Sequence, residues 1–154
     1  MASSITPLKA FKQADLNGAL PYTDQSFAAV AAVELIEHLE NPRRLIRESH
    51  RVLTPGGGAV VTTPNLESFT SLISLVLRGY PSAFSEDNYP AHITPVLKID
   101  LRRMFREAGF TNASTSWSGW GRIPGTPWHW QALSGRGGGR RVSDNYALWA
   151  ARED

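Results

Sequence analysis

The sequence of 154 residues contains no cysteine. A chain without thiols has no disulfide framework, no thiolate metal site and no thiol nucleophile, so the sequence excludes these three classes of site. Its longest apolar-leaning run, Leu72–Leu77, is far shorter than the roughly 20 residues that span a bilayer. Met1–Pro7 also lacks the apolar stretch of a secretion signal. We therefore expect a cytoplasmic protein with no membrane span.

Charge of either sign is also scarce. Charged residues make up 19% of the chain, hydrophobic residues 42%, and the formal net charge is only +2, which fits one globular domain with a real core. The five tryptophans all lie from Trp117 onward, and arginines lie among them, a pattern that stacking nucleic-acid binders share. Core and lid aromatics explain the same residues, so nucleic-acid binding is the weaker alternative.

The first half of the chain has the pattern of a strand–helix–strand unit. Phe27–Val33 is a short apolar run without alternation, which predicts a strand buried on both faces of a parallel sheet. Asn41-Pro42 is a helix start, and Thr54–Gly57 is a stop because proline cannot continue a helix. A β-branched strand is expected directly afterwards, at residues 59–63. The right-handed crossover of such a unit implies that the two strands are parallel.

The second half continues the alternation. We expect a helix at Leu66–Leu77, an irregular segment up to residue 92, and an amphipathic helix that ends at Gly109. Thr111–Trp117 then alternates weakly and predicts a strand, Gly135–Arg141 predicts a loop, and a last strand is expected at residues 144–151. Alternating strands and helices indicate a layered α/β domain.

Several short motifs occur in one order along this framework. They are Asp15–Asn17, Leu20–Phe27, Glu34–Leu39, Arg51–Gly57, Thr63–Asn65, His92–Pro95 and Leu101–Phe110. Together they resemble the class I S-adenosylmethionine-dependent methyltransferases of the type 11 and type 23 domains, which are grouped around the ubiquinone-biosynthesis methyltransferases. The resemblance covers roughly residues 9–118.

The resemblance implies an α/β fold with a Rossmann-like class I methyltransferase sheet, mostly parallel, with an antiparallel last strand. Here we expect that sheet to be incomplete, without its first strands and its glycine-rich cofactor loop. Only 14 residues precede Asp15, too few for a βαβ unit of about 30 residues. We interpret 1–154 as a single partial domain, with 9–118 bearing the motifs, 119–143 rich in loops and 144–151 forming the last strand.

On the donor side, the resemblance implies that S-adenosylmethionine is the cofactor, unless the missing loop has abolished its binding. Asp15 and Leu16 match the positions that contact the adenine ring. Val33 and Glu34 match the end of the strand beside the methionine portion. The ordinary alternative for Asp15 is a loop-capping aspartate.

On the acceptor side, His38 is the predicted general base, and Asn65 and His92 are predicted to contact the acceptor. The alternatives are a solvent-facing histidine for His38 and an Asx turn for Asn65. Glu37 is interpreted as structural. No spacing of histidines and carboxylates indicates a metal site, and no Gly-x-Ser-x-Gly elbow indicates a serine hydrolase.

The predicted function is methyl transfer from S-adenosylmethionine to a small-molecule acceptor. The alternative is a catalytically inactive methyltransferase-like fragment or pseudoenzyme that needs a partner for its missing front half. The strand at 27–33 would then present an unpaired edge, which proteins normally cover. This alternative predicts a homo-oligomer or a complementing chain.

Overall fold

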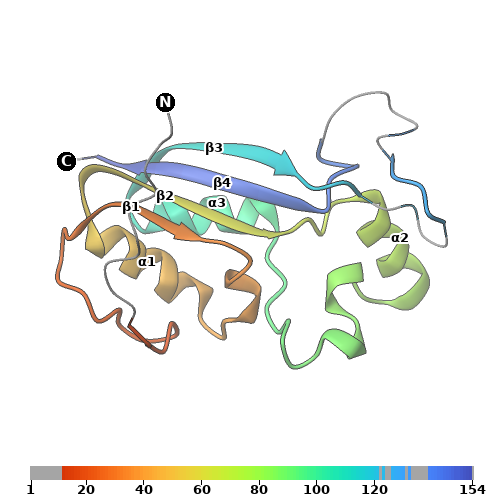
Figure 1. Cartoon of the computed structure of the whole chain (residues 1–154), viewed down its shortest axis with the longest axis horizontal. Helices are drawn as coiled ribbons and strands as arrows, with labels where there is room; N and C mark the ends of the chain where they lie inside the picture. Colours follow the sequence, from red (N-terminus) through yellow and green to blue (C-terminus); the bar gives the residue numbers. More distant parts are fainter. Residues whose placement is uncertain (1–11, 122, 124–125, 131, 133–138, 154) are drawn as a thin grey trace, which may run out of the picture.

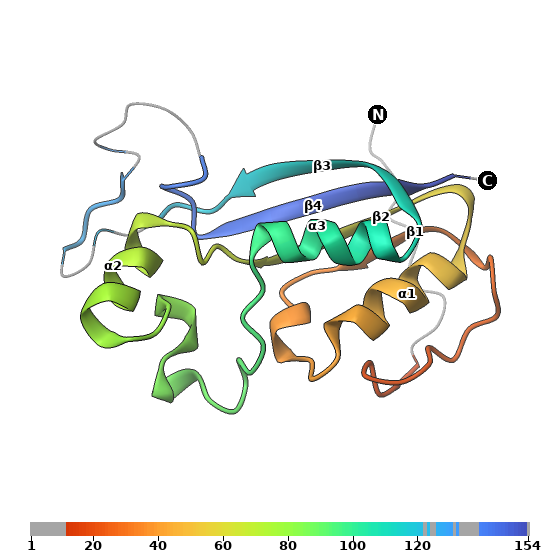
Figure 2. The same ribbon diagram turned by 180° about the vertical axis from the view of Figure 1, so that it is seen from behind.

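The computed structural model describes residues 12–121, 123, 126–130, 132 and 139–153. Its strands form one four-stranded sheet in the order β1-β2-β4-β3 (Figure 1). Two helices, α1 and α3, pack on the same face of this sheet, while α2 lies beyond its end (Figure 2). The elements are β1 (Phe27–Ala32), the 3-10 helix η1 (Ile36–His38), α1 (Pro42–Val52), β2 (Leu53–Pro64), α2 (Phe69–Arg78), the 3-10 helices η2 (Ser82–Phe84) and η3 (Glu86–Asn88), α3 (Lys98–Glu107), β3 (Phe110–Ser118) and β4 (Asn145–Arg152).

The predicted strand–helix–strand unit is present, and β1 and β2 are parallel. The start of α1 is as expected, because the Asn41 side chain accepts a hydrogen bond from the Arg44 N–H at 3.1 Å. The junction with β2 differs from the prediction. The helix ends at Val52 and β2 begins at the next residue, so the Pro-Gly segment belongs to the strand. A Cβ at Gly57 would lie 2.9 Å from the Ala28 carbonyl oxygen, so glycine permits this close strand approach.

The predicted final strands are also present. β4 runs antiparallel to both β2 and β3, so the antiparallel last strand is confirmed. α2 begins at Phe69 rather than at Leu66, because the Ser68 hydroxyl caps the helix by accepting from the Ser71 N–H at 3.2 Å. Most of the loop expected at Gly135–Arg141 lies outside the described residues.

The expectation that β1 is buried on both faces is wrong. Ala28, Ala29 and Ala31 are exposed, and so is nearly half of Trp149 on β4, at 46%. Within the described ranges β1 pairs only with β2, and α1 and α3 both cover the same face. The apolar run therefore predicted a strand correctly but overstated its burial.

The core lies between the sheet and the two helices that cover it. Ile46 on α1, Leu101 and Phe105 on α3, and Leu148 on β4 are completely buried there. Burying one such side chain contributes about 1.5–3 kcal/mol. These contacts fix the ends of β1 and β2, where the candidate site lies. Of the helices described, none combines the length and the apolar content needed to cross a membrane.

Candidate functional site

The chain makes a sharp turn where β1 ends. Glu34 has a φ of 47°, in the left-handed region that residues other than glycine rarely adopt. Its N–H donates to the Thr62 hydroxyl oxygen at 2.9 Å, and that hydroxyl donates to the Glu34 carboxylate at 2.7 Å. Because Thr62 lies near the end of the parallel neighbour β2, one threonine holds the Glu34 backbone and side chain at the carboxyl edge of the sheet.

The Glu34 carboxyl is partly withdrawn from water. Burial raises its pKa above the ordinary value, and the neighbouring Glu37 acts in the same direction. The hydrogen bond from Thr62 and the charges of His92 and His38 oppose this rise in pKa. A carboxyl group with several charged neighbours at the end of parallel strands is typical of a binding site.

Glu37 lies deeper than Glu34 and is only 1% exposed. Its Oε2 accepts a hydrogen bond from the Thr63 hydroxyl at 3.0 Å, whereas Oε1 has no hydrogen-bond partner among the described residues. The backbone carbonyl of Glu37 accepts from the N–H groups of Ile93 and Thr94, both at 3.0 Å. These bonds fasten the segment that follows His92 against η1.

Two histidines meet above Glu37. The His38 and His92 rings contact edge to face, with their centres 4.8 Å apart. Each Nδ1 lies within hydrogen-bond distance of a backbone carbonyl, 2.7 Å from Ala91 O for His38 and 2.6 Å from Ala83 O for His92. When Nδ1 carries the proton that these carbonyls accept, Nε2 of each ring keeps a free lone pair.

Glu37, His38 and His92 form a set that could hold a metal ion. Each offers one ligand atom, and these atoms lie within 4.8 Å of one another. Two imidazole nitrogens and a carboxylate oxygen are ligands that several divalent transition metals accept. The sequence predicted no metal site because no spacing of histidines and carboxylates indicates one. The cluster combines two separate segments, whose approach the spacing does not reveal.

The loop that contains Asp15 and Leu16 is bonded to the segment just after η1. Asp15 is exposed, and its Oδ1 accepts from the Asn17 N–H at 2.9 Å, which is the loop-capping geometry. Asn17 Oδ1 in turn accepts from the N–H of Asn41, the residue that caps α1 just after η1, at 3.0 Å. Leu16 is half-buried and packs against the core. A contact of Asp15 or Leu16 with a cofactor stays a prediction.

Glu48 and Arg51 on α1 hold the continuation of this loop. Glu48, almost fully buried, accepts from the Leu20 N–H at 2.8 Å and from Arg51 Nη2 at 2.7 Å. Arg51 donates to the carbonyls of Leu20 and Tyr22 and to Asp24 Oδ1 at 2.6 Å. The hydrogen bonds from Arg51 lower the pKa of Glu48 below its ordinary value, although burial opposes them. The loop is therefore fixed by the helix.

The remaining predicted residues lie apart from the histidines. Asn65 is buried, and its amide nitrogen donates to the carbonyls of Arg140 at 2.7 Å and Ser143 at 2.8 Å. Its Oδ1 accepts from the Glu67 N–H at 3.1 Å. This bond forms the Asx turn, which was the alternative to an acceptor contact for Asn65. Val33 directly follows β1 and is 65% exposed.

Sequence reasoning missed Thr62 and Thr63 and gave Glu37 only a structural role. The signal that was available is Glu34-x-x-Glu37-His38 immediately after a strand, combined with two threonines at the end of the next parallel strand. Parallel strands end at the same edge of a sheet, so side chains at these positions are expected to lie close together.

Comparisons with known proteins identify the family of the chain. A family profile described as "Methyltransferase domain" matches residues 3–115. The mitochondrial ubiquinone biosynthesis O-methyltransferase of Dictyostelium discoideum is 41% identical over 54 residues, which are 35% of this chain and 16% of that protein. The 27-O-demethylrifamycin SV methyltransferase of Amycolatopsis mediterranei is 36% identical over 81 residues, 48% of this chain and 30% of that protein. The matches thus span less than a third of both relatives.

Solved structures share the fold. A possible histamine N-methyltransferase from Thermotoga maritima superposes with a TM-score of 0.64 at 18% identity, covering 91% of this chain and 62% of that one. A putative methyltransferase in complex with the activator Trm112 from Haloferax volcanii gives a TM-score of 0.60 at 18% identity, covering 92% and 60%. At such identities the likeness concerns the fold alone.

Proposed function

The chain belongs to the methyltransferase domain family, and from this premise we propose that it transfers a methyl group from S-adenosylmethionine to a hydroxyl group of a small molecule. S-adenosylmethionine is the cofactor that membership of this family implies. Both relatives described above support an oxygen acceptor, because the name of one contains "O-methyltransferase" and that of the rifamycin enzyme contains "O-demethyl". The acceptor molecule itself is not specified by these names.

The observation that carries this proposal is the cluster of Glu34, Glu37, His38 and His92 at the carboxyl ends of β1 and β2. Ligands of open α/β sheets bind at this edge. In the proposed site Val33, Glu34 and the loop at Asp15 and Leu16 contact the methyl donor. The histidines lie on the acceptor side. Asn65 takes no part, because both hydrogens of its amide are already donated.

In the proposed reaction the acceptor oxygen attacks the methyl carbon in line with the sulfonium sulfur. A carbon–oxygen bond forms, the carbon–sulfur bond breaks, and S-adenosylhomocysteine leaves. The hydroxyl proton must be removed, and the His38 Nε2 is the proposed base, since its Nδ1 is held by the Ala91 carbonyl.

We propose, as an alternative to a His38 base, that Glu37, His38 and His92 hold a divalent cation. Within the described ranges, Glu37 Oε1 has no hydrogen bond and only a distant contact with His38 Nε2, at 3.9 Å, and a cation between these atoms would compensate the buried oxygen. A bound cation would also lower the pKa of a coordinated hydroxyl group. In that case His38 serves as a ligand and not as the base, because the same Nε2 cannot do both.

Calorimetric titration of the whole chain with S-adenosylmethionine tests the donor site. We expect saturable heat that Glu34→Gln weakens at least about tenfold. Glu40→Gln is the matched control, because Glu40 is exposed, lies nearby and makes no ion pair among the described residues. The absence of heat at millimolar cofactor, or equal weakening by both variants, contradicts the proposed donor site.

A second candidate rests on the exposed side of β1. We propose, as the alternative function, a catalytically inactive methyltransferase-like chain that needs a partner. Another polypeptide, or a second copy of this chain, would cover β1 and the open face around Trp149. An uncovered strand edge exposes unpaired backbone groups and invites association. Light scattering coupled to gel filtration tests this candidate. A monodisperse monomer that binds S-adenosylmethionine contradicts it, and an oligomer or aggregate without cofactor binding favours it.

A further inference from the structure

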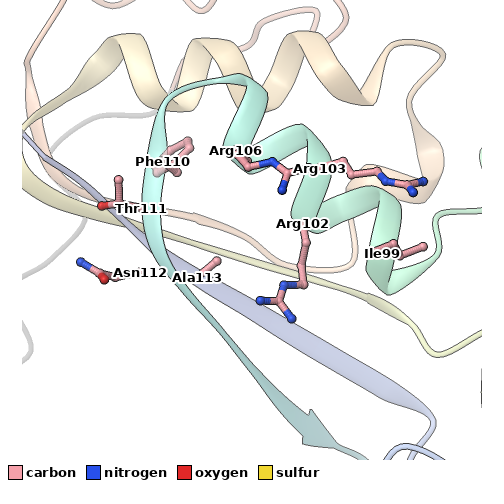
Figure 3. A pocket seen from close by; sticks show the side chains of 8 residues that line it. All are labelled: Ile99, Arg102, Arg103, Arg106, Phe110, Thr111, Asn112 and Ala113. Atoms are coloured by element: carbon pink, nitrogen blue, oxygen red, sulfur yellow. The ribbon is translucent and has the colours of Figure 1, made fainter.

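A cleft lies between α3 and β3 (Figure 3). Its volume is about 540 Å³, and it is lined by three arginines of α3, by Ile99 and by the first residues of β3, Phe110–Ala113. Pockets of this size hold small organic ligands.

This cleft is separate from the candidate methyl-transfer site. β1 and β2 are parallel, and β3 has the same direction because both β2 and β3 run antiparallel to β4. The cleft lies where β3 begins, whereas Glu34 and the histidines lie where β1 and β2 end. The two sites therefore open at opposite edges of the sheet.

The charged side chains that line the cleft are all arginines. Arg102, Arg103 and Arg106 line it, and none of the described acidic residues does. Arg103 makes an ion pair with Asp100 at 3.2 Å, and Glu107 is turned toward α1, where it pairs with Arg43. In the described part of the chain, neither Arg102 nor Arg106 has an ion-pair partner. Like charges four residues apart on one helix face repel each other, so an anion between these two would relieve a cost.

The opposite wall is irregular. The pairing of β3 with β4 shifts register between Thr111 and Ser114, and Asn112 has a φ of 53°. Such a bulge redirects side chains that a regular strand would place elsewhere. The Thr111 hydroxyl is buried within this wall, so a ligand in the cleft does not reach it. The Asn112 amide donates to the Glu153 carboxylate at 2.9 Å. Glu153 is held there and does not line the cleft.

We propose that this cleft binds the phosphate group of a small molecule. Guanidinium groups donate paired hydrogen bonds that match phosphate oxygens. The three arginines span about 6 Å of helix, which suits one phosphate group and not a chain of several. Ile99 and Ala113 offer apolar surface to the organic part of the ligand.

The test is a titration of the ¹⁵N-labelled chain with inorganic phosphate and with phenyl phosphate, at an ionic strength held constant with sodium chloride. We expect saturable shifts of the Thr111, Asn112 and Ala113 amides, with phenyl phosphate binding more tightly. The double variant Arg102→Gln/Arg106→Gln should lose at least about tenfold in affinity. Arg47→Gln/Arg78→Gln removes the same charge from exposed helix positions outside the cleft and should bind as the unmodified chain does.

Three results would overturn the proposal. The first is the absence of saturable shifts at these amides up to about 20 mM phosphate, because a specific site of this kind should have a dissociation constant below roughly this concentration. The second is an equal loss in both double variants, which indicates an unspecific basic surface. The third is tighter, arginine-dependent binding of a single-stranded oligonucleotide or a phosphate-free acidic peptide. If the Arg102/Arg106 variant does not fold, the single variant Arg106→Gln replaces it and should weaken binding severalfold. None of these readouts requires methyl transfer.

Discussion

The imidazole rings of His38 and His92 meet edge to face, with ring centres 4.8 Å apart and ring planes at 71°. His38 ends η1, directly after β1, while His92 belongs to the segment that leads from η3 to α3. Backbone hydrogen bonds from Ile93 and Thr94 to the Glu37 carbonyl hold the two segments together. The two rings and the buried Glu37 carboxylate thus form one preorganised set of donor atoms, on which the first prediction depends.

His92→Ala should weaken the binding of Mn²⁺ at least about tenfold, because it removes one of the three proposed ligands. Electron paramagnetic resonance of free Mn²⁺ in a titration measures this affinity. His129→Ala is the control, since His129 is also a histidine whose Nδ1 lies 2.9 Å from a carbonyl, that of Trp120, outside the cluster. Equal Mn²⁺ affinity in the His92→Ala variant and the unmodified chain would rule out the proposed cation site.

Thr62→Val keeps the shape of the side chain but removes both hydrogen bonds to Glu34. The left-handed turn at Glu34 then loses its support, and we expect the free energy of unfolding to fall by about 1–3 kcal/mol. Urea denaturation followed by circular dichroism measures this change. Thr115→Val on β3 makes the same substitution away from the turn and should cost less. Calorimetry on Thr62→Val should also show weaker S-adenosylmethionine binding if Glu34 contacts the donor.

Glu48→Gln should destabilise the chain more at pH 7 than at pH 3. The folded-state pKa of Glu48 is lowered relative to its ordinary value of 4.5, chiefly by the hydrogen bonds from Arg51. Its ionised form therefore contributes stability above pH 4.5, and this contribution is lost as the pH falls through the lower folded-state value. Urea denaturation of both chains across this range measures the difference, and a gap that stays constant from pH 7 to pH 3 is the contrary result.

Gly109→Ala and Gly79→Ala form a matched pair at two helix ends. Both glycines have positive φ, 97° and 85°, so alanine should cost about 1–2 kcal/mol of stability at each position. At Gly79 nothing lies within 4 Å of the added Cβ, whereas at Gly109 the His50 Nε2 lies 3.2 Å away. We expect the larger loss at Gly109. Thermal unfolding of both variants tests this, and an equal loss would mean that His50 moves aside freely.

Sequence alone determined the order and type of the elements and the family. The cap at Asn41, the left-handed glycine at position 109 and the strand–helix–strand pattern are local signals that depend on neighbouring residues only. Where tertiary contacts compete with such signals, the observed element differs from the predicted one. β2 takes in the Pro-Gly segment that was expected to be a stop, because Gly57 lets it approach β1.

Only the tertiary structure decided how exposed β1 is. It also decided that the Asn65 amide donates to the segment before β4 and that His92 lies beside Glu37 and His38. Burial depends on which elements cover a strand, and the apolar run at 27–33 carries no information about that. Contacts between side chains far apart in the sequence follow from how the whole sheet and its helices pack. For this reason the sequence named His38 and His92 separately, and folding alone made them neighbours.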